Sequence, residues 1–122
     1  MAAVTTGQLL HDLRQACSRS SLVSHIEERL VDADILSVRV HLTVARTFIN
    51  VFHNITTNKT AFALIKGGQR LYGVDNAKMG WHRHPFGDPS QHVLCTPVRF
   101  TDFLAQVEAY YSQDSQTVRA TP

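Results

Sequence analysis

The 122 residues predict one α+β domain in which helices cover one face of an antiparallel sheet. Three observations support this class. Apolar residues recur every three to four positions near both ends of the chain, they alternate with polar residues in the middle, and turn-forming residues separate the alternating segments. A hydrophobic content of 43% against 18% charged residues excludes a disordered chain and suffices for one core.

Two helices are expected at the N-terminal end, over residues 5–32. The first spans 5–17 with Thr5 or Thr6 as its N-cap, because a threonine hydroxyl accepts a hydrogen bond from the free amides of the first turn. The second spans 21–32, where apolar residues recur at helical spacing. Its apolar stripe consists of Leu22, Val23, Ile26 and Leu30.

Four or more antiparallel strands are expected over residues 35–75, joined as a meander. Apolar and polar side chains alternate from Leu36 to Val44, which is the period of a half-buried strand. Gly67-Gly68 marks a tight turn, since glycine adopts positive φ at little cost. Because the connections are short, consecutive strands should be antiparallel neighbours. The predicted strands are 36–44, 47–54, 60–66 and 69–75.

A long loop and a final helix are expected to follow the strands. Residues 76–97 lack a regular period and hold three of the four prolines and the only tryptophan. Long aperiodic segments in a compact domain are usually functional or disordered, and one rich in aromatic residues and histidine favours function. Residues 99–113 are predicted to form the last helix, which packs on the sheet. Its apolar face consists of Phe100, Phe103, Leu104, Val107 and Tyr111.

Composition argues against several classes of protein. No stretch has the roughly 18–20 apolar residues that span a bilayer, so we expect no membrane association. The N-terminal residues lack the basic and apolar regions of a secretory signal. We therefore expect a cytoplasmic protein with Cys17 and Cys95 reduced. The net charge of +2 is low for a nucleic-acid-binding protein.

Residues 81–92 are the segment best suited to chemistry. Three of the seven histidines, one arginine and one aspartate fall within it. In an extended segment His82 and His84 point to the same side, and Pro85 favours that conformation in the residue before it. The two imidazoles could act as a general acid and base, or they could bind zinc together with His92.

Several neighbouring residues allow a structural explanation beside a functional one. Asp75 could orient a histidine or only end its strand with turn chemistry. Asp88, which precedes a proline, could line the site or cap one helical turn. Trp81 could stack on a ligand, although packing is the commoner role of such a side chain. Arg39 could extend a basic surface, or it could simply face solvent on the polar side of its strand. Arg83 alternates with the histidines and points away from them unless the segment bends.

A resemblance to a known family covers residues 35–112. It is carried by Asn50-Val51-Phe52-His53-Asn54, Lys59-Thr60-Ala61-Phe62-Ala63-Leu64-Ile65, Asp75-Asn76 and Trp81-His82-Arg83-His84-Pro85-Phe86. These segments resemble the TumE-type toxins of prokaryotic toxin–antitoxin pairs, which also carry a strand ending in Asp-Asn before a segment rich in histidine and proline. The order of elements is similar to that of RelE-like ribonuclease toxins. The resemblance implies a small cytoplasmic protein that pairs with an antitoxin and binds or cleaves RNA.

The favoured hypothesis is therefore a toxin-like protein acting on RNA, and whether it is an enzyme stays open. His82 and His84 would be base and acid without a cofactor, with Asp75 beside them. Arg83, Arg39 or Arg70 would supply the cation for the phosphate. The candidate binding residues are Trp81, Asp88, His92 and Arg39. Two alternatives remain: a metal-binding protein that holds zinc on His82, His84 and His92, or a non-catalytic interaction domain. A homodimer or a complex with an antitoxin is expected.

Overall fold

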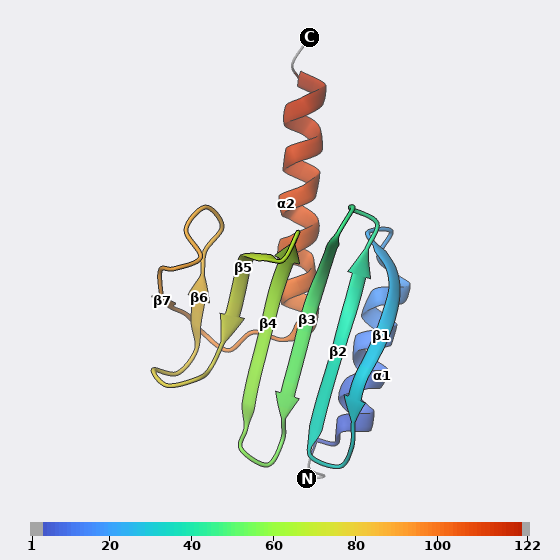
Figure 1. The fold of residues 1–122 in the computed structure, drawn as a ribbon, viewed down its shortest axis with the longest axis vertical. Helices are drawn as coiled ribbons and strands as arrows, with labels where there is room; N and C mark the ends of the chain where they lie inside the picture. The colour runs from blue at the N-terminus through green and yellow to red at the C-terminus, as the bar shows by residue number, and fades with distance from the viewer. Residues whose placement is uncertain (1–3, 121–122) are drawn as a thin grey trace.

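The fold is an antiparallel sheet with both helices on one of its faces (Figure 1). The structure, a computed structural model, describes the backbone of residues 4–120 and the side chains of residues 4–113. Helix α1 (Thr6–Ser18) precedes the sheet and helix α2 (Phe100–Ala120) follows it. The strands are β1 (Val23–Val31), β2 (Ile35–Leu42), β3 (Thr47–Asn54), β4 (Lys59–Lys66), β5 (Gln69–Asp75), β6 (His82–His84) and β7 (Val93–Leu94).

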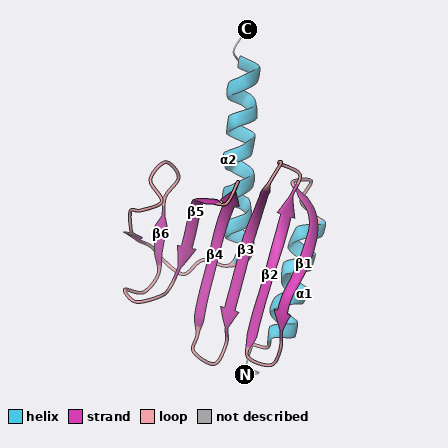
Figure 2. Ribbon diagram, viewed as in Figure 1, coloured by secondary structure: helices cyan, strands magenta, loops and turns pink. Residues whose placement is uncertain are grey.

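The predicted meander is confirmed and extends further than expected. The described strands form one seven-stranded sheet in the order β1 to β7, and every neighbouring pair is antiparallel (Figure 2). The four strands predicted over residues 36–75 are consecutive neighbours, although β2 ends at Leu42 rather than at Val44. Residues 76–97 are not a continuous loop, because they contain the two short strands β6 and β7.

The prediction of a second N-terminal helix over 21–32 is wrong, because this segment forms the edge strand β1. The pairing of β1 with β2 shifts register at two bulges, between Val23 and His25 and between Glu28 and Leu30. Each bulge inserts one extra residue into the strand. Val23 and Ile26 therefore both pack on the core although they are three positions apart. The first bulge thus reproduces one helical interval within a strand, whereas Leu30, beyond the second bulge, is 47% exposed.

The core lies between the sheet and the helices. Alternate residues of the central strands are buried on this side, as the alternation from Leu36 predicts. Helix α2 contributes its predicted face, in which Phe103 is fully buried against the rings of Phe62 and Tyr72. The helix continues to Ala120, beyond the predicted end at residue 113. Across the described residues, neither helix is long and apolar enough to cross a membrane.

Helix α1 is joined to β1 by polar contacts. The Thr5 hydroxyl accepts a hydrogen bond from the amide of Gln8, which confirms Thr5 as the predicted N-cap. The hydroxyl of Thr6 donates to the carbonyl oxygen of Asp32, just beyond the end of β1, at 2.6 Å. Arg14 of the same helix pairs with Glu28 of β1. These contacts hold the helix against one side of the edge strand.

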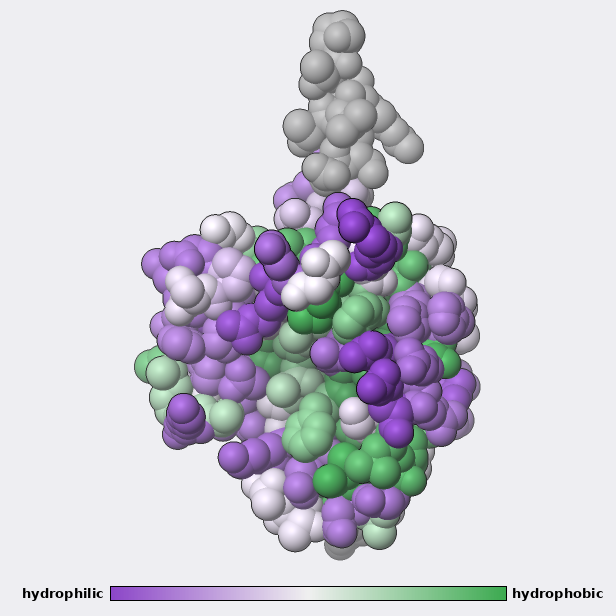
Figure 3. All heavy atoms as spheres, in the orientation of Figure 1, coloured by the Kyte–Doolittle hydropathy of each residue, from purple (hydrophilic) through white to green (hydrophobic). Residues whose placement is uncertain are grey.

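The opposite face of the sheet is covered by neither helix, and we call it the open face. Figure 3 shows this face, with apolar surface in its middle and hydrophilic margins around it. Cross-strand pairing places Arg39, Asn50, Ala63 and Gly73 in one transverse row on this face. Gly73 pairs in turn with His84 of β6. The histidine-rich segment therefore lies at one end of the open face.

Candidate metal centre

Strand pairing brings Asp75, His82 and His84 together at the β5–β6 end of the open face. Asp75 pairs with His82, and Gly73 pairs with His84. Residues two apart in a strand share a face, so the carboxylate and both imidazoles project to the same side. Both imidazoles are buried, with only 5% of His82 and 4% of His84 exposed. The two histidines do lie on one side, as the extended segment predicts.

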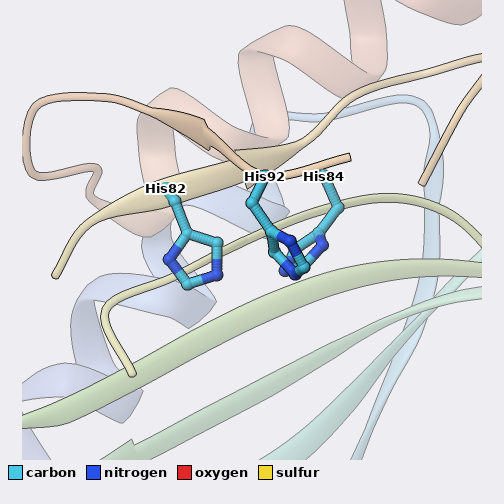
Figure 4. A group of neighbouring side chains, drawn as sticks. All are labelled: His82, His84 and His92. Carbon is cyan, nitrogen blue, oxygen red and sulfur yellow. The ribbon is translucent and has the colours of Figure 1, made fainter. Parts of the chain in front are cut away.

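His92 joins this cluster from the loop that connects β6 to β7. Two turns shape the loop, in which Asp88 donates its amide to the carbonyl of Pro85 and Gln91 donates to that of Asp88. The ring centroid of His92 lies 5.3 Å from that of His82 and 4.8 Å from that of His84. One ring nitrogen from each histidine lies within 4.8 Å of the others. Figure 4 shows the three side chains extending to the same side of the ribbon.

A backbone carbonyl group lies beside Nδ1 of each buried histidine. Nδ1 of His82 lies 2.8 Å from the carbonyl oxygen of Gly80, and Nδ1 of His84 lies 3.1 Å from that of Pro89. A carbonyl oxygen only accepts hydrogen bonds, so Nδ1 of His82 carries hydrogen, and in the neutral ring Nε2 holds the free lone pair. Nδ1 of His84 also faces the Nη2 donor of Arg70 at 3.3 Å, so this ring is compatible with either tautomer.

Both Nε2 atoms face the carboxylate of Asp75. Nε2 of His82 lies 3.3 Å from Oδ1, and Nε2 of His84 lies 3.0 Å from Oδ2. A carboxylate oxygen and the lone pair of a neutral His82 ring are both acceptors, so they repel at this distance unless a cation or a proton lies between them. His84 can instead donate its Nε2 hydrogen to Oδ2 of Asp75 while Nδ1 accepts from Arg70. Oδ1 also accepts from the amide of Ala77, so the turn chemistry expected of Asp75 is present as well.

Gly73 and Arg70 complete the surroundings of His84. A Cβ atom on Gly73 would lie 3.2 Å from Cδ of Arg70 and 3.5 Å from Cδ2 of His84. Because Gly73 has no side chain, the side chain of Arg70 can pass over it toward His84. Its Nη2 donates to the Pro89 carbonyl at 3.1 Å and lies 3.3 Å from Nδ1 of His84. The Pro89 carbonyl therefore lies within hydrogen-bonding distance of both the Arg70 guanidinium and Nδ1 of His84.

Four of the residues singled out in the sequence lie outside this cluster. Arg83 pairs with Val74 and projects to the helix side, where its Nε is buried without a hydrogen-bond partner. Trp81 is half-buried against the core and acts as the expected packing residue. Asp88 is exposed, and its carboxylate accepts hydrogen bonds from the amide and hydroxyl of Ser90. Arg39 lies on the open face, four strands away from His84.

Two contributors were not singled out from the sequence. Gly73 interrupts an otherwise apolar strand, and an isolated glycine in a strand is a known sign of close approach by a neighbouring group. The Pro89 carbonyl has no signal in the sequence, because its direction depends on how the loop folds. His53 lies outside the site, because it points to the helix side and packs against Phe62. Burial there lowers the pKa of His53 below its ordinary value.

Neither protein-family models nor curated proteins nor solved structures give a match to this chain. Function must therefore be inferred from the geometry of the candidate metal centre.

Proposed function

We propose that the protein binds a divalent transition-metal ion through His82, His84, His92 and Asp75. The observation that supports this most strongly is the convergence of one ring nitrogen from each of three histidines, two of them buried, beside the Asp75 carboxylate. The Nε2 lone pair of a neutral His82 faces Oδ1 of Asp75. A divalent cation between the two removes the repulsion of these acceptors.

The Asp75 distances and the outer contacts agree with zinc. Ligand atoms about 2.0–2.1 Å from a tetrahedral zinc ion lie about 3.3 Å from one another. The two contacts of Asp75 with the Nε2 atoms, 3.3 and 3.0 Å, are close to this spacing, whereas the three histidine nitrogens, within 4.8 Å of one another, would move closer together on binding the ion. Metal-bound histidines commonly donate their other ring nitrogen to a backbone carbonyl, as His82 does and as one tautomer of His84 does. Three imidazoles with one carboxylate favour zinc over calcium or magnesium, which prefer oxygen ligands.

The exposure of His92 suggests what the ion could do. His82 and His84 are buried, whereas His92 lies exposed at the rim. Solvent and small molecules can therefore reach the ion from that side. With four protein ligands the tetrahedral site is closed, so water would bind there only as a fifth ligand; the ion would then polarise that water and lower its pKa, as in hydrolytic zinc sites.

Zinc titration of metal-free protein by calorimetry tests the proposal. We expect one zinc ion per chain, with affinity reduced at least about 100-fold in His84→Ala, because a ligand is lost. His11→Ala is the matched control, since His11 is exposed on helix α1 and lies outside the cluster. Absence of saturable binding, or equal affinity in His84→Ala and His11→Ala, would overturn the proposal.

A second variant tests the same ligand set in case His84→Ala does not fold. His92 is exposed, so His92→Ala should keep the fold while it removes a ligand. With cobalt in place of zinc, the visible absorption bands should be intense for the four-coordinate wild type. They should weaken and shift in His92→Ala. An identical cobalt spectrum in the two proteins would exclude His92 from the ligand set.

We propose as a second candidate the toxin-like action on RNA expected from the sequence. One observation favours it. The guanidinium of Arg70 lies beside His84, where Asp75 contacts the ring, so Arg70 is the one of the three candidate arginines that can supply the cation there. An acid, a base and a cation are the groups that RNA cleavage without a metal requires.

Cleavage of single-stranded RNA in the presence of a chelator separates the two candidates. Cleavage that persists in chelator and is lost in His84→Ala and Arg70→Gln, but not in Arg46→Gln, would support the acid–base candidate. Arg46 is exposed in the turn between β2 and β3, which makes it a suitable control. Cleavage that disappears with the metal would assign the activity to the metal centre. Absence of cleavage under both conditions would overturn the action on RNA.

A further inference from the structure

A hollow of about 400 Å³ lies in the middle of the open face, and we call it the central hollow. Its floor contains the small side chains of Ala61 and Ala63. Ala61 pairs with Asp75 and Ala63 pairs with Gly73, so the floor adjoins the strand that carries the metal centre. The central hollow and the metal centre are therefore neighbouring parts of one surface.

Three polar side chains with unused hydrogen-bonding groups border the central hollow. They are Ser37, Arg39 and Asn50, and among the described residues none of them has a side-chain hydrogen bond or an ion pair. Arg39 and Asn50 are direct cross-strand neighbours. Both can therefore donate to the same bound group.

Arg39 is half-buried and has no carboxylate partner in the part of the chain whose side chains the structure describes. Glu27 stands directly opposite Arg39 in the adjacent strand, yet its carboxylate contacts His41 at 2.8 Å and Arg29 at 3.2 Å instead. The guanidinium of Arg39 lies over the ring of Phe48, 4.6 Å from its centre, which leaves its fork of donors available. Such a fork matches a carboxylate or a phosphate.

We propose that the central hollow binds the oxyanion group of an organic substrate whose other end reaches the metal centre. The part of this inference that places the other end of the substrate at the metal centre rests on the proposed metal function. The anion site is argued independently, from Arg39 and Asn50. Neighbouring strands are about 4.8 Å apart, so three strand spacings from Asn50 to His84 cover about 14 Å. The substrate is thus a compound of about nucleotide length with a phosphate or carboxylate at one end.

Titration of the metal-free, ¹⁵N-labelled chain with inorganic phosphate, and separately with acetate, tests the anion site. We expect phosphate or acetate to shift the side-chain N–H resonances of Arg39 and Asn50 with saturation. The anion that binds more tightly identifies the end group as a phosphate or a carboxylate. Arg39→Gln should weaken the binding at least about tenfold, because the charge-assisted hydrogen bonds are lost. Arg46→Gln should leave it unchanged.

Two outcomes would overturn the anion site: no saturable shift with either anion, or equal shifts in Arg39→Gln and Arg46→Gln. His84→Ala should keep the anion site, because that substitution removes only a metal ligand. A failure of zinc binding together with normal phosphate binding would thus refute the metal function and leave the anion site standing. The reverse pattern would refute the anion site alone.

The reach of the substrate is tested in the cobalt-loaded protein with adenosine 5′-monophosphate as the probe. Relaxation of its phosphorus nucleus by cobalt reports the distance between them. We expect a phosphorus–cobalt distance of about 10–15 Å, set by the strand spacing. Contact of the phosphate with cobalt, or no relaxation effect at a saturating concentration of the probe, would overturn the inference that one substrate spans both sites.

Discussion

Gly73 shows how one residue position controls the candidate metal centre. It pairs with His84, and the side chain of Arg70 passes over it. A Cβ atom there would lie 3.3 Å from the carbonyl oxygen of Phe62, which belongs to the backbone and yields less than a side chain. The glycine is therefore needed for close approach rather than for an unusual backbone angle.

Substitution of Gly73 should affect zinc binding in proportion to side-chain size. Gly73→Ala should be tolerated with a loss of about 1 kcal/mol in unfolding free energy, since a shift of a few tenths of an ångström suffices. Gly73→Val should displace Arg70 and His84 and weaken zinc binding at least about tenfold. Thermal unfolding and zinc calorimetry measure the two effects. Zinc affinity in Gly73→Val equal to that of the wild type would show that the close approach is unimportant.

Cys17 should make the protein less stable at alkaline pH. Burial raises the pKa of its thiol from 9.0 to about 11, an effect that Arg14 opposes and Glu108 reinforces. Between about pH 9 and 11 the unfolded chain therefore releases a proton that the folded chain retains, and the free energy of unfolding falls as pH rises. The full effect is about 3 kcal/mol. Burial of Tyr72 raises its pKa and acts in the same direction.

Urea denaturation at pH 8 and at pH 10.5 measures this loss. Cys17→Val removes the thiol while it keeps an apolar side chain of similar size. The variant should show a smaller decrease in unfolding free energy between the two pH values than the wild type. An equal decrease in both proteins would mean that Cys17 contributes nothing to the alkaline transition.

At the scale of single elements, β1 shows where local pattern is misleading. Its apolar residues recur at helical spacing, and its glutamates and arginine favour a helix. Pairing with β2 overrides this preference, and the bulge between Val23 and His25 places both Val23 and Ile26 on the core side despite their spacing. Such long-range pairing cannot be recognised from the segment alone. The alternation in β2, in contrast, has no bulge and was predicted correctly.

Helix α2 should contribute strongly to stability through a single aromatic residue. Phe103 is fully buried, with ring centres 5.5 Å from Phe62 and 5.3 Å from Tyr72. Phe103→Ala should lower the free energy of unfolding by about 3–5 kcal/mol, because it leaves a cavity in the core. Leu94→Ala, at a side chain that is 71% exposed, should change it by less than about 0.5 kcal/mol. Urea denaturation compares the two, and similar losses would contradict this packing.

At the scale of the whole molecule, zinc should stabilise the fold. The proposed ligands come from β5, from β6 and from the loop before β7, so one ion joins the last three strands. A ligand at 100 times its dissociation constant adds about 2.7 kcal/mol to the unfolding free energy. For a domain of this size that corresponds to a rise in melting temperature of about 10 °C.

Thermal unfolding with and without zinc checks this increase. His92→Ala should lose most of the rise, because it removes a proposed ligand at an exposed position. His11→Ala should keep it. A rise of the same size in His92→Ala and in the wild type would contradict the proposed ligand set.

Several features follow from patterns among residues that are close together in the chain. They are the fold class, the central strands, the cap of the first helix and the apolar face of the last helix. Such patterns depend on the local periods of helix and strand, which sequence displays directly. Other features depend on pairing between distant segments of the chain. They are the edge strand β1, the short strands β6 and β7, and the positions of Arg83 and Arg39 relative to the histidines. The alternation of His82, Arg83 and His84 already predicted which two share a face. Whether Asp75 and His92 would meet them was decided by hydrogen bonds across β5, β6 and β7, since only the sheet register brings those side chains to one point.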